Sequence, residues 1–303
     1  MNATHAGNGA PAYRIALGPL LYYWTQQETL DFYVDVASTP VDIIYLGETV
    51  CSRRHALRHE EWLDLARMLR DSGKQVLLST RTLIESGSEA MAMQRICEQD
   101  DFAVEAGEVG AIRARGGRGF VAGPHLNAYN GETLAWLHSL GATRFVAPLE
   151  MDQHTLRQLI AEKPSALQAE VMVWGRMPLA FSSRCFTARH FHRRKDDCNF
   201  HCSEHPDGLD LRTRESQDFL AINGIQTQSA ACLDLINQAA NLAQAGVDVL
   251  RVSPQSQGTL EAILALDAVR RGEQPQAVKP PEGIRLCNGY WHGHAGIEHL
   301  ELV

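Results

Sequence analysis

Three of the seven cysteines in this 303-residue chain lie close together, at positions 185, 198 and 202. The three-residue gap between Cys198 and Cys202 lets both thiolates face one centre from a single turn. The longer gap after Cys185 forms a loop that closes over the other side. Thiolates in such an arrangement bind zinc or an iron–sulfur cluster, and either centre is normally completed by four ligands. The segment therefore predicts a metal centre that needs one more ligand.

Cys51 is the favoured fourth ligand because of its expected place in the fold. It lies in GETVCSRRH (47–55), directly after a predicted strand, and Cys185 likewise follows a predicted strand at 169–175. Loops that follow the strands of a parallel barrel all emerge at the same, C-terminal face. Cys97 and Cys232 are predicted to be buried apolar residues within helical segments, with Cys232 at the start of a helix spanning 232–247. The remaining alternatives for the fourth ligand are Cys287, His190, His192, His201 and His205.

The spacing alone leaves the identity of the metal open. Structural zinc sites commonly use paired C-x2–4-C knuckles, whereas only Cys198 and Cys202 form such a short pair here. This difference favours a [4Fe–4S] cluster over zinc. A third interpretation, a loop of unligated thiols, is disfavoured because clustered cysteines in a chain without an export signal more often bind metal.

Short β-branched runs alternate with amphipathic segments along the whole chain. Eight such runs predict a closed TIM-barrel-like (β/α)8 fold, with an open doubly wound sheet as the alternative. The rhythm breaks over residues 176–231, which we expect to form a Cys-rich insertion at the C-terminal face of the barrel. We expect a disordered N-terminus at 1–12 and one domain at 13–303. The predicted strands are 13–18, 41–47, 75–80, 101–105, 119–124, 143–148, 169–175 and 247–254.

Polar residues at the ends of predicted strands are candidates for a substrate pocket at the same face. Residues 125–130 follow the strand at 119–124, and Asn130 is expected to cap the next helix. No arrangement typical of a serine peptidase or of an H-E-x-x-H metallopeptidase is present. The pocket candidates are His125, Asn127, Tyr129, Trp174 and Arg176.

Cationic side chains surround the candidate cysteine ligands, although the whole chain is acidic. The net charge of -8 disfavours a general nucleic-acid binder, so a local basic patch would attract an anion or offset the charge of a thiolate-bound cluster. Neither a secretory signal nor an apolar run long enough to span a membrane is visible, and we expect a cytoplasmic protein. The cations concerned are Arg53, Arg54, Arg184, Arg189, Arg193, Arg194 and Lys195.

Several of these segments resemble the collagenase-like peptidase family U-32. The cysteine pattern is the specific part of this resemblance, whereas the segments containing LNAYN and AGVDVLR are shared more loosely across the family. The matching segments are GPLLYYW (18–24), VDIIYLGETVCSRRH (41–55), HLNAYNGETLAWLHSLGATRFVAPLEM (125–151), GRMPLAFSSRCFTARH (175–190), FLAINGIQTQSA (219–230), AGVDVLRVSPQ (245–255) and NGYWHG (288–293).

The resemblance implies a barrel-like fold and a [4Fe–4S] cluster held by Cys51, Cys185, Cys198 and Cys202. Within the family, the chain is most similar to members of ubiquinone biosynthesis, which implies a heterodimer with a UbiU-like homologous subunit. Such a pair supports oxygen-independent hydroxylation of the ubiquinone ring precursor, with prephenate as the oxygen donor and a UbiT-like lipid-binding protein presenting the prenylated ring. The cluster would act as an electron relay or a structural support. The alternatives are a zinc-stabilised scaffold without a redox role and a collagenase-like peptidase.

Overall fold

The chain forms a closed barrel of eight parallel strands. The structure is a computed structural model that describes residues 12–301. Strands β1 to β7 pair in order of sequence, and β11 closes the ring by pairing with both β7 and β1. The predicted TIM-barrel-like fold is confirmed, and all eight predicted strands occur. The barrel strands are β1 (Arg14–Leu17), β2 (Ile43–Leu46), β3 (Gln75–Ser79), β4 (Ala103–Ala106), β5 (Phe120–Ala122), β6 (Ala142–Val146), β7 (Gln168–Phe181) and β11 (Val249–Val252).

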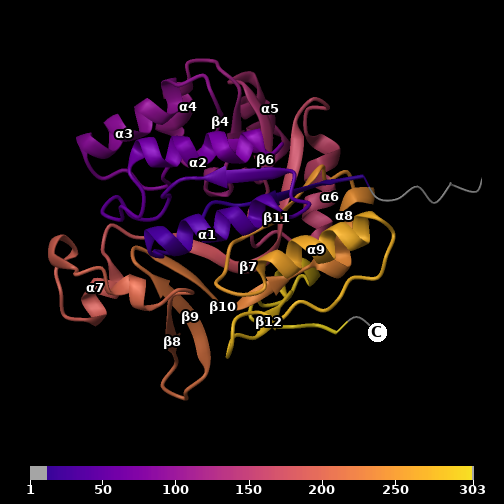
Figure 1. The fold of residues 1–303 in the computed structure, drawn as a ribbon. Helices are drawn as coiled ribbons and strands as arrows, with labels where there is room; N and C mark the ends of the chain where they lie inside the picture. Colours follow the sequence, from indigo (N-terminus) through magenta and orange to yellow (C-terminus); the bar gives the residue numbers. More distant parts are fainter. Residues whose placement is uncertain (1–11, 302–303) are drawn as a thin grey trace, which may run out of the picture.

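Helices surround the barrel and cover the outer face of its strands (Figure 1). Most begin at a side-chain cap, and the predicted cap Asn130 accepts a hydrogen bond from the backbone of Thr133 at 2.8 Å. One prediction is wrong: residues 232–247 do not form one helix, because Cys232 lies in strand β10 (Gln226–Asp234). The helices are α1 (Gln26–Ala37), α2 (His59–Asp71), α3 (Gly87–Glu98), α4 (Val109–Arg115), α5 (Gly131–Ser139), α6 (Gln153–Glu162), α8 (Ala239–Gln244) and α9 (Thr259–Arg270).

Strand β7 continues beyond the barrel and carries the insertion. Its later residues pair antiparallel with β10, which pairs in turn with β9 (Asp218–Asn223) and then β8 (Leu209–Arg212). Residues 218–223 thus form the central strand of this small antiparallel sheet. The short helix α7 (Phe186–His190) and the cysteine-bearing loop lie between β7 and β8, beside this sheet (Figure 1).

The inside of the barrel contains buried charges as well as apolar side chains. Glu170 is fully buried and accepts hydrogen bonds from Arg251 Nε at 2.5 Å, Arg144 Nη1 at 3.2 Å and the Tyr45 hydroxyl at 2.5 Å. Arg251 also pairs with Glu105 at 2.7 Å. Two guanidinium groups therefore balance two carboxylates, so the buried charges are compensated.

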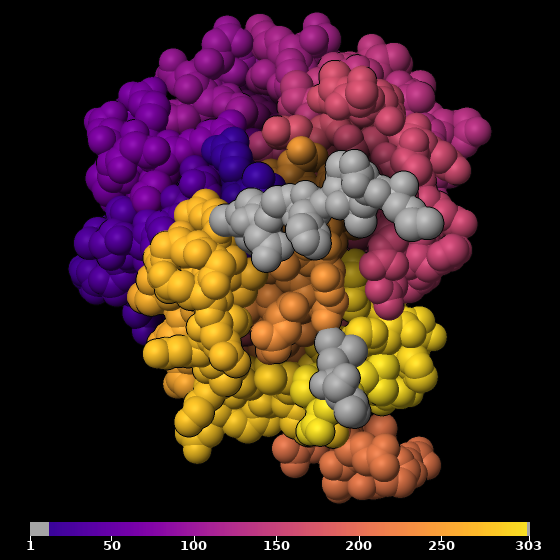
Figure 2. Space-filling view, turned by 90° about the vertical axis from the view of Figure 1, so that its right-hand side faces the viewer, coloured from indigo at the N-terminus to yellow at the C-terminus, as the bar shows by residue number. Residues whose placement is uncertain are grey.

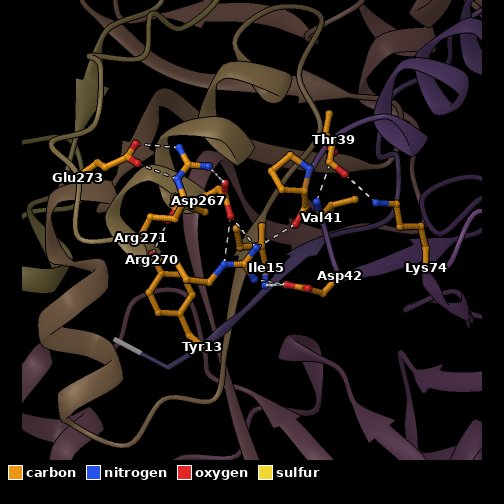
Figure 3. A network of polar contacts seen from close by, with 12 residues as sticks. Tyr13, Ile15, Thr39, Val41, Asp42, Lys74, Asp267, Arg270, Arg271 and Glu273 are labelled. Atoms are coloured by element: carbon orange, nitrogen blue, oxygen red, sulfur yellow. Dashed lines mark hydrogen bonds and ion pairs between the residues drawn. The ribbon is translucent and has the colours of Figure 1, made fainter. Parts of the chain in front are cut away.

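A second polar network closes the N-terminal end of the barrel, opposite the end that carries the insertion (Figure 3). Asp42, at the entrance to β2, accepts from the Ile15 backbone at 2.7 Å and from Arg270 Nη1 at 2.7 Å. The Tyr13 hydroxyl donates to the Leu266 carbonyl at 2.6 Å. These contacts join the end of α9 to the first two strands and so tie the last βα unit to the first.

The C-terminal segment packs back on the barrel. Strand β12 (Leu286–Cys287) pairs with β10, and Trp291 is buried in the main core, as expected for an aromatic anchor. Figure 2 shows the face formed by α8, α9 and this segment, with the insertion around β8 standing out at its lower edge. Among residues 12–301, no helix is both long and apolar enough to cross a bilayer.

Candidate functional site

The four candidate cysteines come together at the C-terminal face of the barrel. Cys51 is buried in the loop after β2, and Cys185 caps the N-terminus of α7, where its sulfur accepts from the Ala188 backbone at 3.4 Å. Cys198 and Cys202 follow in two short 3-10 turns of the insertion. Cys185 lies within electrostatic reach of the other three thiols. The fold thus brings one thiol from the second βα loop to three thiols of the insertion.

The thiols occupy an environment that disfavours an isolated thiolate. Burial raises the pKa of Cys185, and the neighbouring cysteines raise it further, although a helix N–H opposes this. Burial also raises the pKa of Cys202, while the adjacent Arg54 lowers it through its charge and a hydrogen bond. A bound metal would displace the thiol protons, so the affinity of this site for metal should increase with pH.

Apolar side chains enclose Cys51, whereas Cys185, Cys198 and Cys202 are partly exposed. Cys51 packs in a buried cluster with Leu21, Val50 and Ile225, and Phe181 and Cys185 pack against it. Phe181 is the last residue of β7, so the extension of this strand past the barrel places one wall of the site. Such surroundings exclude solvent and lower the local dielectric constant, which strengthens every charge interaction at the site.

Arg54 is the one buried cation at the cysteines within the described part of the chain, and it is 2% exposed. Its guanidinium donates to the Leu21 carbonyl at 2.7 Å and to the side-chain oxygen of Asn223 at 2.6 Å. Asn223 ends β9, and its amide donates to the same carbonyl at 2.8 Å. The hairpin therefore holds Arg54 beside the Cys202 sulfur. Asn223 was not identified from sequence, because its role depends on a tertiary contact.

The backbone between Cys198 and Cys202 is tightly wound. Asn199 and Phe200 both have left-handed conformations, with φ of 50° and 54°. Asparagine tolerates this region, whereas a bulky residue such as phenylalanine rarely adopts it. The Phe200 ring packs against Tyr23 with 5.4 Å between centroids, which offsets the strain and covers the site.

Three surface cations near the cysteines form ion pairs with acidic side chains. Arg53 pairs with Asp196 at 3.4 Å, Arg193 pairs with Asp197 at 3.8 Å, and Lys195 pairs with Glu85. These pairs are exposed or half-buried and contribute little individually to stability. The pairs of Arg53 and Lys195 join the insertion to the loops after β2 and β3, and all three pairs reduce the basic potential that the sequence predicted.

A small cavity lies at the mouth of the barrel beside the cysteine site. It has a volume of about 50 Å³, which holds about four water molecules, and Leu21 and Phe181 separate it from Cys51. Glu105 and Arg251 of the interior network form part of its lining. His125 lines it too; burial lowers the pKa of this imidazole to about 4, and Arg251 adds to that effect. His125 is therefore neutral at physiological pH.

The other pocket candidates do not line this cavity. Asn127 and Tyr129 are exposed, and the Tyr129 hydroxyl donates to Glu150. Trp174 is fully buried in the main core. Arg176 is buried and donates to the Asp207 carbonyl at 2.9 Å and to Asp210 at 2.8 Å, so it fastens the start of the hairpin. Both β7 residues are enclosed because the strand does not end at 175 but continues to Phe181.

The alternative candidates for the fourth ligand are buried in the core, exposed to solvent or in contact with other side chains. Cys97, Cys232 and Cys287 are fully buried, and the last two lie within electrostatic reach of each other on β10 and β12. His190 and His192 are exposed, whereas His201 stacks on Phe191 and contacts Glu204, and His205 stacks more distantly on Phe191. Within residues 12–301, no three His, Cys, Asp or Glu side chains are grouped closely enough to hold a single metal ion.

The closed parallel barrel, with a cysteine-bearing loop and a hairpin inserted at its C-terminal face, places the chain among the TIM-barrel-like α/β proteins. Residues 33–272 match the model of peptidase family U32, and the chain belongs to that family. It is similar to the solved U32 peptidase Mk0906, with a TM-score of 0.46 and 12% identity over 84% of this chain and 98% of that one. It is also similar to tryptophan synthase from M. tuberculosis, with a TM-score of 0.43 and 12% identity over 86% of this chain and 90% of that one.

Proposed function

We propose that the chain is an iron–sulfur protein of family U32 in which Cys51, Cys185, Cys198 and Cys202 hold a [4Fe–4S] cluster. The observation that carries this proposal is the convergence of four thiols from two distant parts of the chain in an apolar surround. In a cubane cluster each of the four thiolates binds a different iron, whereas in a single-ion site all the ligands bind the same atom. Four thiolate sulfurs are the donor set that a [4Fe–4S] cluster takes.

The chain's own residues would hold and protect this cluster. When bound, a [4Fe–4S] cluster supplies one-electron transfer. The four thiolates leave no position for substrate, so the protein's part is that of an electron relay or a structural support. Arg54 offsets negative charge at Cys202, and Leu21 and Phe181 exclude water on the side of the mouth cavity.

We further propose that this subunit supports oxygen-independent hydroxylation in ubiquinone biosynthesis. The chain resembles the ubiquinone biosynthesis protein UbiV, which implies a UbiU-like partner, prephenate as oxygen donor and a UbiT-like protein that presents the prenylated ring. The volume of the mouth cavity, about 50 Å³, supports a division of labour, because a prenylated ring does not fit within it. The ring would then be bound outside this cavity, and the partner is its proposed carrier.

Anaerobic purification tests the cluster directly. We expect visible absorption typical of iron–sulfur proteins and about four irons with matching acid-labile sulfide per chain. Cys51→Ala and Cys198→Ala should each lose both, whereas Cys97→Ala should keep them, because Cys97 is buried in the core away from the site. Stoichiometric zinc without sulfide would replace this proposal with a zinc-stabilised scaffold. A Cys51→Ala variant that retains its cluster would exclude Cys51 as a ligand.

Reconstitution tests the biosynthetic role. The purified chain, its homologous partner and the lipid-binding protein are incubated without oxygen with the ring precursor and prephenate, and the ring products are analysed by mass spectrometry. Hydroxylated product that depends on both subunits is expected. Cleavage of gelatin by the chain alone, with no hydroxylation, would favour the peptidase alternative.

A further inference from the structure

A second cavity lies between the barrel and helices α2 and α3, under the loop that carries Cys51. Its volume is about 310 Å³, which falls at the lower end of the range for small-molecule sites. Leu57, Trp62, Leu78, Met93 and Ile96 supply apolar walls. The space is therefore large enough for a compact ring or a short chain, unlike the cavity at the barrel mouth.

Three arginines without acidic partners line this cavity. No salt bridge in residues 12–301 involves Arg58, Arg81 or Arg95. The Nε atom of Arg81 is buried and has no hydrogen-bond partner. In contrast, Arg251 at the barrel mouth is fully engaged by two carboxylates. The Arg81 Nε–H is thus a buried donor without a protein acceptor, a cost that an anionic ligand would remove.

Within residues 12–301, neither Glu48 nor Glu89 forms an ion pair with these arginines. Glu48 is the acidic residue of the lining, and its carboxylate already accepts from the Ala56 backbone at 2.9 Å. Burial raises the pKa of Glu48 to about 7, so it carries only part of its negative charge at neutral pH. Glu89 lies within electrostatic reach of Arg81 but outside the lining, and it accepts from the Glu85 backbone at 2.7 Å.

We propose that this cavity binds a small organic carboxylate with an apolar ring or chain. The body of the ligand lies against Trp62 and the aliphatic walls, and its carboxylate meets the guanidinium of Arg81. A planar guanidinium matches a carboxylate through two parallel hydrogen bonds. None of the cavity residues is a proposed cluster ligand, so this site stands independently of the proposed function.

Calorimetric titration of the purified chain with 3-phenylpropionate tests the site. We expect saturable binding of this acid and of hexanoate, and at least about tenfold weaker binding of the neutral analogue 3-phenylpropan-1-ol, because a charge-assisted pair is lost. Arg81→Gln should weaken binding of the acid to a similar extent. Arg113→Gln, which changes an exposed arginine on α4, should leave it unchanged.

A second variant separates binding from folding. Ala92→Phe fills the cavity from α3 and should abolish binding of both acids while the chain keeps its far-ultraviolet circular dichroism. Absence of saturable binding of either acid at millimolar concentration overturns the proposal. Equal affinities for acid and alcohol, or unchanged affinity in Arg81→Gln, overturn it as well.

Discussion

At the scale of the residue, burial distinguishes two neighbouring arginines that the sequence treats alike. Arg53 and Arg54 both follow Cys51, and both were predicted to add positive potential at the cysteines. The structure turns Arg53 outward to the exposed Asp196, whereas it buries Arg54 against Cys202 and Asn223. Cys185, Cys198 and Cys202 could be proposed as ligands from residue type and spacing, and Cys51 from its expected place after a barrel strand. The part played by Arg54 could not, because it depends on a hairpin far along the chain.

Removal of the Arg54 charge should make the proposed cluster harder to reduce. Reduction adds a negative charge, which a buried cation stabilises strongly in a low dielectric. Arg54→Gln should therefore shift the reduction potential to more negative values, measured by a spectroelectrochemical titration. Arg53→Gln is the matched control and should shift it much less, because its side chain is exposed to solvent. Equal shifts in the two variants would contradict a special role for Arg54.

His125 should make the stability of the protein depend on pH in the acidic range. Its folded pKa of about 4 lies below the ordinary value of 6.5, so the unfolded chain binds a proton that the folded chain does not. The contribution of His125 to the free energy of unfolding is then complete above pH 6.5. It is lost as the pH decreases towards 4, by about 3 kcal/mol at most. Urea unfolding of the wild type and His125→Asn at several pH values measures this. A pH dependence that is identical in the two proteins would exclude His125 as its source.

At the scale of the element, the turn of the β9–β10 hairpin positions Arg54 and the start of α7 at the cysteine site. Gly224 has φ of 65°, and a side chain there would come within 2.9 Å of the Arg54 guanidinium. Its carbonyl accepts from the Phe186 backbone at 2.9 Å, which positions the start of α7 directly after Cys185. One glycine thus lets the hairpin approach both the cation and a cysteine-bearing helix.

Gly224→Ala should destabilise the protein and weaken retention of the metal. The left-handed backbone costs about 1 kcal/mol for alanine, and the close approach to Arg54 adds to it. Gly283→Ala is the matched control, since Gly283 has φ of 78° but no neighbouring atom within 4 Å. Thermal unfolding and iron content are measured for both. Similar losses in the two variants would show that backbone conformation alone matters at position 224.

The elements of the barrel were predictable because each strand is a short apolar run between helical segments. The strands of the insertion were harder to predict. Cys232 and its alanine neighbours in β10 have small side chains that fit a helix as well as a strand, and pairing with β7 and β12 decides between the two. The burial of Trp174 and Arg176 was not predicted either. It follows from the continuation of strand β7, which runs on to pair with β10.

At the scale of the whole molecule, the barrel was predictable but its charged interior was not. Eight strand-like runs indicate closure, yet the charges within several of these apolar runs do not show that they face one another. Glu105, Arg144, Glu170 and Arg251 lie on four different strands and meet inside the ring. The sequence feature that could have indicated this network is a charged residue in the middle of several apolar strands.

Glu170→Gln should destabilise the whole barrel. It keeps the shape of the side chain but leaves Arg144 and Arg251 with an uncompensated buried charge, which costs about 3–5 kcal/mol. The control is Asp64→Asn, which breaks an exposed pair with Arg67 and should cost less than about 1 kcal/mol. Urea unfolding followed by circular dichroism measures both. A loss of under about 1 kcal/mol in Glu170→Gln would show that the network contributes little net stability.

The continuity of β7 also has a consequence for how the molecule opens. Its 14 residues belong first to the barrel and then to the hairpin sheet, so no flexible joint separates the two. The insertion is therefore expected to belong to the same cooperative unit as the barrel and not to act as an independently opening lid. Backbone amides of β10 that pair with β7 should exchange with deuterium as slowly as those of β11. Fast exchange confined to β10 would identify a separate, less stable unit around the cysteines.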